Sequence, residues 1–571
     1  MTFGFVKNVL AYGALLALLA NNHPAGAASG PRSTSSTTST PIQHVIIIIQ
    51  ENRSFDQYFG TYPNANGIPA GTCVPLDPNN PGLGCVVPFH DMHDVNAGGP
   101  HSSASAQFDL DDGITTDKND GFVYQQTRAP IGTNCKATCS GLLDGVARHD
   151  AMGYHTRDEI PNYWAYADQF VLQDQMFEGE RSWSLSAHLD LASEWVASCT
   201  DPTNASTCTS AVKLPRPVAG TKYPWVNLFQ LLDANGVSWK YYLGTGNEPD
   251  CADGEMTCDP EVQSSTIPSI WNVMPYFTTV QAQGAAYLKL HNPPVEQFLA
   301  DIASGTLPQV SWIVPNEVYS EHPPSSITVG MEYVTSLVNA VMQSQYWANT
   351  AIFITWDDWG GFYDHVAPPN VDLNSTKNPI EGFGLRVPGL LISAYAKPGY
   401  IDHGVLSSDS YATLIEDLFA GGARLDPVAL GNPDNRPDLR DSVTQVTFPN
   451  GTTAPVANLI DEFDFTQTPL PPLVLSTHIP TEITATCAPG GAVACTSAFV
   501  TIAWAAVTGP HVPGPFTYHI QRDGAELPQC VGTATSCTDA PGSGAHFYRA
   551  YSVDSAGVAS PVSAAAEADE P

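Results

Sequence analysis

The sequence predicts an α/β protein with a mainly parallel central sheet sandwiched by helices, followed by a separate all-β sandwich. Three observations predict this architecture. Residues 44–50 form a continuous β-branched run, which is typical of a strand buried on both faces of a parallel sheet. Further apolar runs alternate with helical stretches, as in α/β proteins. Near residue 468 the pattern changes to short strands separated by turns.

The N-terminus has the pattern of a secretory signal peptide. Lys7 is the only charged residue in the first 20, residues 9–20 are apolar, and Ala25-Gly26-Ala27 offers small residues for cleavage. We therefore expect a signal peptide over residues 1–28, a Ser/Thr-rich linker over residues 29–40, and a protein secreted to the periplasm or the outside. No other apolar run reaches the length of a membrane span, so we predict no transmembrane helix.

Composition narrows the possible partners. The chain has 571 residues, of which 43% are hydrophobic and 14% are charged, so most of it can bury a core. Its formal net charge of -35 is opposite in sign to that of a nucleic-acid-binding protein, which needs Lys and Arg against phosphates. We therefore expect no nucleic-acid partner.

The 12 cysteines fall into close pairs along the chain. In an exported protein such pairs predict local disulfides. Zinc binding at Cys135 and Cys139 is the alternative, but no second Cys or His pair lies near them in the sequence. The expected bridges are Cys73/Cys85, Cys135/Cys139, Cys199/Cys208, Cys251/Cys258, Cys487/Cys495 and Cys530/Cys537.

Residues 41–467 form the expected α/β domain. Its strands are predicted to present functional side chains at their carboxyl ends, as parallel sheets do. Asn235-Gly236 marks the end of one helix and leads into the next strand. The predicted strands are 44–50, 238–242, 310–314, 351–355 and 390–393, and the predicted helices are 184–195, 227–234, 331–344 and 410–420.

A β-sandwich is expected over residues 474–568, after the Pro-rich stretch 468–472. Its predicted strands are 499–505, 516–522 and 546–553. The stretch 548–560 resembles the end of a fibronectin type III domain. This part of the chain contains no catalytic cluster, and the sequence does not identify its partner.

Acidic and amide side chains follow two of the predicted buried strands. Glu51 and Asn52 come directly after residues 44–50, and Asp357 and Asp358 follow residues 351–355. Each offers a hard oxygen ligand, and two adjacent carboxylates repel each other unless a cation or a proton separates them. The alternatives are a helix cap at Asn52 and a solvated turn at the aspartates. Flanking tryptophans favour the metal site.

A third motif runs from Glu178 to His188. A glycine-containing loop leads into a predicted helix that begins at Ser184. A serine at a helix N-terminus lies beside unpaired amides and the positive end of the helix dipole, which suits an anionic phosphate. The alternative is an ordinary N-cap.

Together these motifs resemble the bacterial phosphoesterase family of phospholipases C and acid phosphatases, in the alkaline phosphatase superfamily. The resemblance covers about residues 41–440 and is most specific in Val45-Ile-Ile-Ile-Ile-Gln-Glu-Asn-Arg-Ser-Phe-Asp-Gln-Tyr-Phe-Gly60. The segments 118–123, 152–161 and 356–365 are also similar to the family's. An alkaline phosphatase-like fold is therefore implied for the α/β domain.

The resemblance also implies roles for individual residues. It makes Ser184 the nucleophile, because the acid-phosphatase branch has a Ser four positions before a His, here His188. Ser182 and Ser186 are the neighbouring alternatives. It places His322 at the leaving group and His101 and His365 around the bound phosphate. It assigns the metal to Glu51, Asn52, Asp357 and Asp358.

We expect a secreted phospholipase C type hydrolase with one divalent cation, Ca²⁺, Mg²⁺ or Mn²⁺, because the ligands are oxygens. Zinc is the alternative cation if histidines are also ligands. Its substrate is then a phosphoester or phospholipid, with transient contact to a membrane surface. The phospholipase branch usually has a Thr nucleophile within Thr-Asn-Pro-Asn-Arg, so a soluble-phosphomonoester acid phosphatase is the first alternative. A carboxylic ester hydrolase is a further alternative, but the chain contains no Gly-x-Ser-x-Gly motif. A non-catalytic binding protein is the last alternative.

Overall fold

The computed structural model describes residues 40–110, 118–128, 149–249, 261–371, 382–487, 499–507 and 515–570, apart from the single positions 219, 438, 482, 543 and 556. The signal peptide predicted over residues 1–28 lies outside the described residues, as does the linker up to residue 39. In the part of the chain that the structure describes, no helix is both long and apolar enough to span a membrane.

A seven-stranded sheet forms the centre of the α/β domain and confirms the predicted fold class. Every strand is parallel to the others except β15, which runs antiparallel to both neighbours. The predicted strand at 390–393 is therefore present but reversed. The order across the sheet is β10 (Trp239–Leu243), β13 (Val310–Val314), β1 (His44–Gln50), β14 (Thr350–Trp356), β15 (Gly389–Ser393), β6 (Val171–Gln173) and β16 (Tyr400–Asp402).

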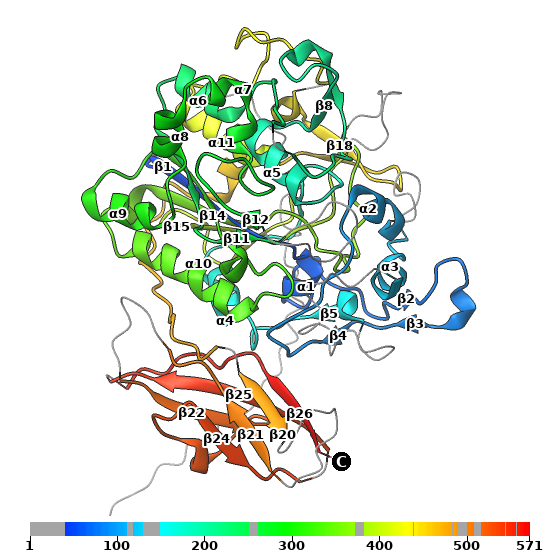
Figure 1. Cartoon of the computed structure of the whole chain (residues 1–571), viewed down its shortest axis with the longest axis vertical. Helices are drawn as coiled ribbons and strands as arrows, with labels where there is room; N and C mark the ends of the chain where they lie inside the picture. Colours follow the sequence, from blue (N-terminus) through cyan, green and yellow to red (C-terminus); the bar gives the residue numbers. More distant parts are fainter. Residues whose placement is uncertain are drawn as a thin grey trace, which may run out of the picture.

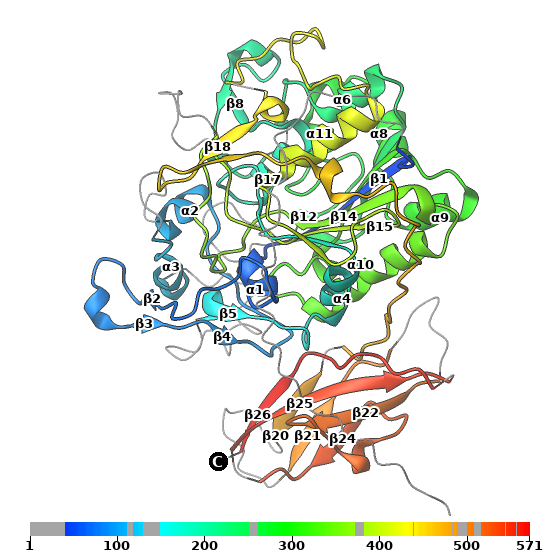
Figure 2. The same ribbon diagram turned by 180° about the vertical axis from the view of Figure 1, so that it is seen from behind.

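Helices cover both faces of this sheet (Figures 1 and 2). Helices α4 (Pro161–Gln169) and α10 (Ile327–Met342) lie on the side nearer the C-terminal domain. Helices α5 (Ser184–Ser193), α6 (Leu228–Ala234) and α11 (Ser408–Phe419) lie on the other. Because both faces are covered, the side chains of β1 from Val45 to Gln50 are buried, which explains its uninterrupted apolar sequence.

Shorter elements surround the sheet. The remaining helices are α1 (Phe55–Phe59), α2 (Ser103–Asp109), α3 (Phe122–Arg128), α7 (Thr278–Gln281), α8 (Ala285–His291) and α9 (Glu296–Ser304). Two-stranded ladders join β2 (Val74–Pro75) to β3 (Cys85–Val86), β4 (Phe89–His90) to β5 (Gly153–Tyr154), β7 (Met176–Phe177) to β17 (Leu406–Ser407), β8 (Ala197–Cys199) to β9 (Cys208–Ser210), β11 (Asn247–Glu248) to β12 (Glu261–Val262), and β18 (Gln445–Thr447) to β19 (Thr453–Pro455).

The C-terminal domain is built from two antiparallel sheets, as expected. Their inward side chains, including Ile502, Trp504, Ile520 and Tyr548, form one shared core. The fibronectin type III class and the limits 474–568 stay predictions. One sheet contains β20 (Thr484–Cys487), β21 (Val500–Ala503) and β24 (Ser536–Asp539), and the other contains β23 (Ala525–Glu526), β22 (Thr517–Arg522), β25 (Gly544–Val553) and β26 (Ala566–Glu570).

The C-terminal domain contacts the α/β domain directly (Figure 1). Arg549 forms an ion pair with the buried Glu159, and the Ala565 N–H donates to the Met92 carbonyl at 2.7 Å. The connecting segment is also hydrogen-bonded along its course, since the Leu470 N–H donates to the Ala394 carbonyl at 2.7 Å. The Pro-rich stretch between the two domains is therefore attached to the surface of the α/β domain by hydrogen bonds.

Three of the predicted local disulfides are confirmed. They join Cys73 to Cys85, Cys199 to Cys208, and Cys530 to Cys537. The pairs Cys135/Cys139 and Cys251/Cys258 lie outside the described residues, and so do the Cys487 side chain and Cys495. No free cysteine occurs among the residues that are described.

One partly buried acid of the α/β domain makes the stability of the fold depend on pH. Glu332 of α10 accepts a hydrogen bond from the Ile479 N–H at 2.5 Å. Removal from water, reinforced by the charge of Asp94, raises the pKa of Glu332 from 4.5 to about 8. The folded chain therefore holds a proton that the unfolded chain has lost, so this contribution to stability is full below pH 4.5 and disappears as the pH rises through 8.

Glu332→Gln should remove this dependence, because a neutral amide can accept the same N–H at every pH. We expect the wild type to lose up to about 1.4 kcal/mol of unfolding free energy per pH unit relative to the variant between pH 4.5 and 8. Urea unfolding at pH 5, 6.5 and 8 measures the difference. Glu296→Gln, at an exposed position of α9, is the control. Equal pH slopes in all three proteins would contradict the prediction.

Candidate active site

The carboxyl ends of β1 and β14 bring the two acidic motifs together. The strands pair in register, with Gln50 opposite Trp356. Past the paired ends, the Asn52 N–H donates to Asp357 Oδ1 at 2.9 Å, and the Arg53 N–H donates to the Asp358 carbonyl at 2.9 Å. Neighbouring parallel strands thus place the oxygens of both motifs at one edge of the sheet, as the sequence predicted.

Close backbone approach at this edge requires glycine. Asn52 has a positive φ of 60°, and Gly360 has a φ of 61°. A Cβ atom on Gly360 would lie 2.4 Å from the Asn52 carbonyl oxygen. Any side chain at position 360 would therefore push Asn52 away from Asp357.

Ser184 begins helix α5 and is fully buried against these motifs. Its Oγ lies 3.2 Å from Asn52 Oδ1 and 3.1 Å from Asp358 Oδ2, within hydrogen-bonding distance of both. Trp183, the N-cap residue, makes no side-chain capping bond. The serine hydroxyl, the helix N-terminus and the acidic edge of the sheet therefore meet at one point.

The two neighbouring serines face elsewhere. The hydroxyls of Ser182 and Ser186 both donate to the Val212 carbonyl, at 2.7 Å and 3.1 Å. Because successive residues of a helix are about 100° apart, Ser186 points away from the direction that Ser184 takes. Of the three candidate serines, the structure brings Ser184 to the acidic residues.

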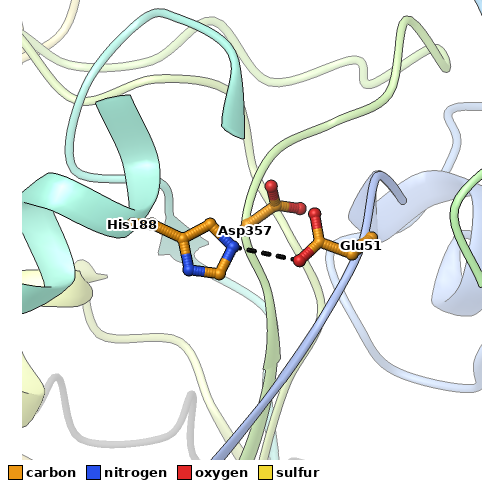
Figure 3. A group of neighbouring side chains, drawn as sticks. All are labelled: Glu51, His188 and Asp357. Atoms are coloured by element: carbon orange, nitrogen blue, oxygen red, sulfur yellow. Dashed lines mark hydrogen bonds and ion pairs between the residues drawn. The ribbon is translucent and has the colours of Figure 1, made fainter. Parts of the chain in front are cut away.

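His188 lies one helical turn after Ser184 on α5 and faces the same acidic residues. Its Nε2 lies 3.0 Å from Glu51 Oε1, and both side chains are fully buried. Figure 3 shows the ring of His188 turned towards Glu51, with the Asp357 carboxylate beside them. Ligand atoms of Glu51, His188 and Asp357 lie within 4.8 Å of one another.

These residues fit a divalent cation. Asp357 Oδ2 is buried and makes no hydrogen bond to any described residue. An unsatisfied buried carboxylate oxygen is costly, and a cation in this group would satisfy it. The donors are mostly oxygens, which favours Ca²⁺, Mg²⁺ or Mn²⁺, while His188 adds one nitrogen that would suit zinc.

Asn52 contacts Ser184 through its Oδ1 and His101 through its Nδ2, and a second histidine, His322, lies next to His101. His101 Nδ1 lies 2.9 Å from the Gly99 carbonyl, so it carries the proton, and Nε2 accepts from Asn52 Nδ2 at 3.2 Å. The His322 ring is 6.0 Å from the His101 ring, and its Nδ1 donates to the Pro323 carbonyl at 2.8 Å. The structure thus brings two of the three predicted histidines together, with His101 in contact with Asn52 and His322 next to His101.

Comparison with known proteins identifies the chain. The Phosphoesterase family matches residues 42–420, which is most of the α/β domain.

The chain belongs to the Phosphoesterase family. It is therefore a hydrolase that acts on phosphoester bonds. It is 27% identical to Phospholipase C A of Mycobacterium tuberculosis (strain CDC 1551 / Oshkosh), over 66% of this chain and 73% of the relative. It is 28% identical to a non-hemolytic phospholipase C of Burkholderia pseudomallei, over 68% of this chain and 57% of that one. A solved alkaline phosphatase superfamily protein of Vibrio parahaemolyticus is 12% identical with a TM-score of 0.30, over 68% of this chain and 69% of that one.

His365 of the phosphoesterase lies in a different set of contacts. Its Nδ1 is 2.7 Å from Asp56 Oδ2, and Asp56 and Asp364 both pair with the fully buried Arg386. This ion-pair group fixes the loop after β14 to the segment after β1. The structure does not join His365 to the hydrogen bonds around Ser184.

Sequence reasoning did not assign Glu178 or His188 to the phosphoesterase site. Burial and the charge of Asp358 raise the pKa of Glu178 well above its ordinary value. Glu178 and Asp357 also line one small pocket, together with residues of β7, α5 and α11. The spacing of Ser184 and His188, four residues apart on one helix, was the available signal that His188 faces the acidic group. Glu178 begins the third motif, but nothing local in the sequence indicates that its side chain turns towards Asp357 and Asp358.

Proposed function

We propose that this phosphoesterase is a metal-dependent enzyme of phospholipase C type that attacks phosphorus with Ser184 and passes through a phosphoseryl intermediate. The position of Ser184 carries the proposal: its hydroxyl lies 3.1 Å from Asp358 at the start of a helix. A nucleophile at that position lies next to the amides that would bind a phosphate. The relatives named phospholipase C support a phospholipid substrate.

Glu51, Asn52, Asp357 and Asp358 are the proposed ligands of one divalent cation, with His188 beside them. Bound there, the cation would lower the pKa of the serine hydroxyl and offset the charge of the phosphate.

Residues of the chain itself carry out the bond-forming and proton-transfer steps. Ser184 Oγ passes its proton to Asp358 Oδ2, to which it donates a hydrogen bond, and forms a bond to phosphorus in line with the leaving alcohol. The bond from phosphorus to that alcohol's oxygen breaks. His322 in its protonated form donates the proton that the leaving oxygen needs. Its Nδ1–H is held by the Pro323 carbonyl, so the proton comes from Nε2 and the ring is left neutral. Water then attacks the phosphoserine and gives a proton to the neutral His322 as its oxygen bonds to phosphorus. The bond from phosphorus to Ser184 Oγ breaks, and Oγ takes back the proton held by Asp358, which restores the hydroxyl. His101 holds Asn52 through its Nε2.

Hydrolysis of soluble phosphomonoesters, as an acid phosphatase, is the second candidate. The supporting observation is the serine itself, because the resemblance associates Thr with the phospholipase branch and Ser with the phosphatase branch. In either case the signal-like N-terminus supports export. A phospholipid substrate would add transient contact with a membrane surface.

Two chromogenic substrates separate these candidates. We expect the purified chain to hydrolyse para-nitrophenyl phosphorylcholine at least about 10-fold faster than para-nitrophenyl phosphate, a difference of about 1.4 kcal/mol in activation free energy. EDTA should abolish both activities, and added Ca²⁺, Mg²⁺ or Mn²⁺ should restore them. The reverse preference would favour the phosphatase. Chelator-resistant hydrolysis of para-nitrophenyl acetate alone would indicate a carboxylic esterase, and binding without turnover would indicate a non-catalytic protein.

A further inference from the structure

A second buried acidic group lies at the far end of helix α5. Its members are Glu194, Glu416 and Asp441, which come from the C-cap of α5, from α11 and from the short 3-10 helix Arg440–Ser442. Each is at most 2% exposed, and ligand oxygens of all three lie within 4.8 Å of one another. Three carboxylates far apart in sequence therefore converge where α5 packs beside α11.

Several oxygens of these carboxylates make no hydrogen bond to a described residue. Both carboxylate oxygens of Glu194 are buried and make no hydrogen bond to a described residue, and the same holds for Glu416 Oε1. Asp441 is better satisfied, because its Oδ2 accepts from the Leu425 N–H at 3.0 Å. An unpaired buried carboxylate is among the costliest groups that a protein can enclose. Glu194 reaches this position through a left-handed backbone, with φ 53°.

The nearby guanidinium groups are engaged with other acids. Arg424 contacts Glu416 Oε2 at 3.2 Å but lies closer to Asp417, at 2.8 Å. Arg436 pairs with Asp434 at 3.0 Å, and Arg440 pairs with Glu180 at 3.1 Å. The group therefore holds more negative charge than these arginines balance. Either a proton or a cation must supply the difference.

We infer that Glu194, Glu416 and Asp441 bind a hard divalent cation, represented by Ca²⁺, which fastens the C-terminal end of α5 to α11. Carboxylate oxygens are the ligands that calcium prefers, and the group contains no thiolate or imidazole to favour zinc. The site is separate from the catalytic one, because the ten residues of α5 span about 15 Å between Ser184 and Glu194. Its role is structural: it would hold in place the helix that carries Ser184.

Calcium binding is tested in the full-length chain, with the catalytic ligands disabled by Asp358→Asn. After EDTA treatment and removal of the chelator, we expect Asp358→Asn to bind one Ca²⁺ per chain in a titration calorimeter. Calcium at 100 times its Kd should raise the unfolding temperature by about 3 °C. The double variant Asp358→Asn/Glu194→Gln should bind none and show no calcium-dependent shift.

The competing outcome is a shared proton. In that case Glu194→Gln, which mimics the neutral acid, would fold with unchanged or higher stability, and Asp358→Asn would bind no calcium. That result would overturn the inference. Should Glu194→Gln not fold, Asp441→Asn takes its place in the Asp358→Asn background, and calcium binding that survives this substitution refutes the second site. Failure here would leave the catalytic proposal untouched, since chelator-sensitive turnover depends on the other group.

Discussion

Ser184→Ala is expected to lower kcat by about 10⁴-fold or more while the fold is retained, as removal of a catalytic nucleophile does. The Ser184 side chain is the one hydroxyl among the three candidate serines that lies against Asn52 and Asp358. Removing it leaves phosphorus without its attacking group, while the helix loses no capping bond, because Ser184 follows the N-cap. Initial rates on para-nitrophenyl phosphorylcholine measure the loss.

Ser182→Ala and Ser186→Ala are the matched controls, since both hydroxyls donate to the Val212 carbonyl. Each should keep kcat within about 10-fold of the wild type, a change of at most about 1.4 kcal/mol. Vanadate, which imitates five-coordinate phosphorus, should inhibit these variants tightly and should no longer do so in Ser184→Ala. Full activity in Ser184→Ala would leave an activated water or another serine as the nucleophile.

Asp358→Asn is expected to lower kcat/KM by about 10³-fold and to weaken binding of the catalytic cation. One Asp358 oxygen accepts from the Gly360 N–H at 2.7 Å and the other lies against Ser184. The amide keeps the volume but loses the charge that both the cation and the serine require, and loss of one such electrostatic contact commonly costs 10²–10³-fold.

Metal content and activity should fall together in Asp358→Asn. Asp168→Asn is the control, because Asp168 is an exposed aspartate paired with Arg157. It should match the wild type in both measurements. An Asp358→Asn variant with normal metal content and normal turnover would place the cation elsewhere.

The sequence was most informative where a signal is local. The predicted strands at 44–50 and 310–314 match β1 and β13, because strands covered on both faces need uninterrupted apolar residues. Ser184 could be placed at a helix start because the loop before it contains glycine and the helix after it is apolar. The acidic pairs Glu51/Asn52 and Asp357/Asp358 could be placed at one edge, since parallel neighbours end together.

Features set by long-range packing could not be predicted. The reversal of β15 depends on the path of the chain between β14 and β15, which residue types do not determine. Glu194 lies more than 200 positions before Glu416 and Asp441, with which it forms one group. The ion pair of Arg549 with Glu159, between the two domains, likewise has no local sequence signal. His365 ends the motif that contains the proposed metal ligands Asp357 and Asp358, yet its contacts are with Asp56 and Arg386.

The most direct test of the central proposal is to trap the phosphoserine. The enzyme is mixed with substrate, quenched in acid within milliseconds, digested and analysed by mass spectrometry. We predict a modified peptide with the added group on Ser184, a bare phosphoryl from a phosphomonoester and a phosphorylcholine from the diester. Ser184→Ala should give no adduct, and Ser186→Ala should give the same one as the wild type. An adduct on any other residue, or none at all during a burst of released nitrophenol, would contradict Ser184 as the nucleophile.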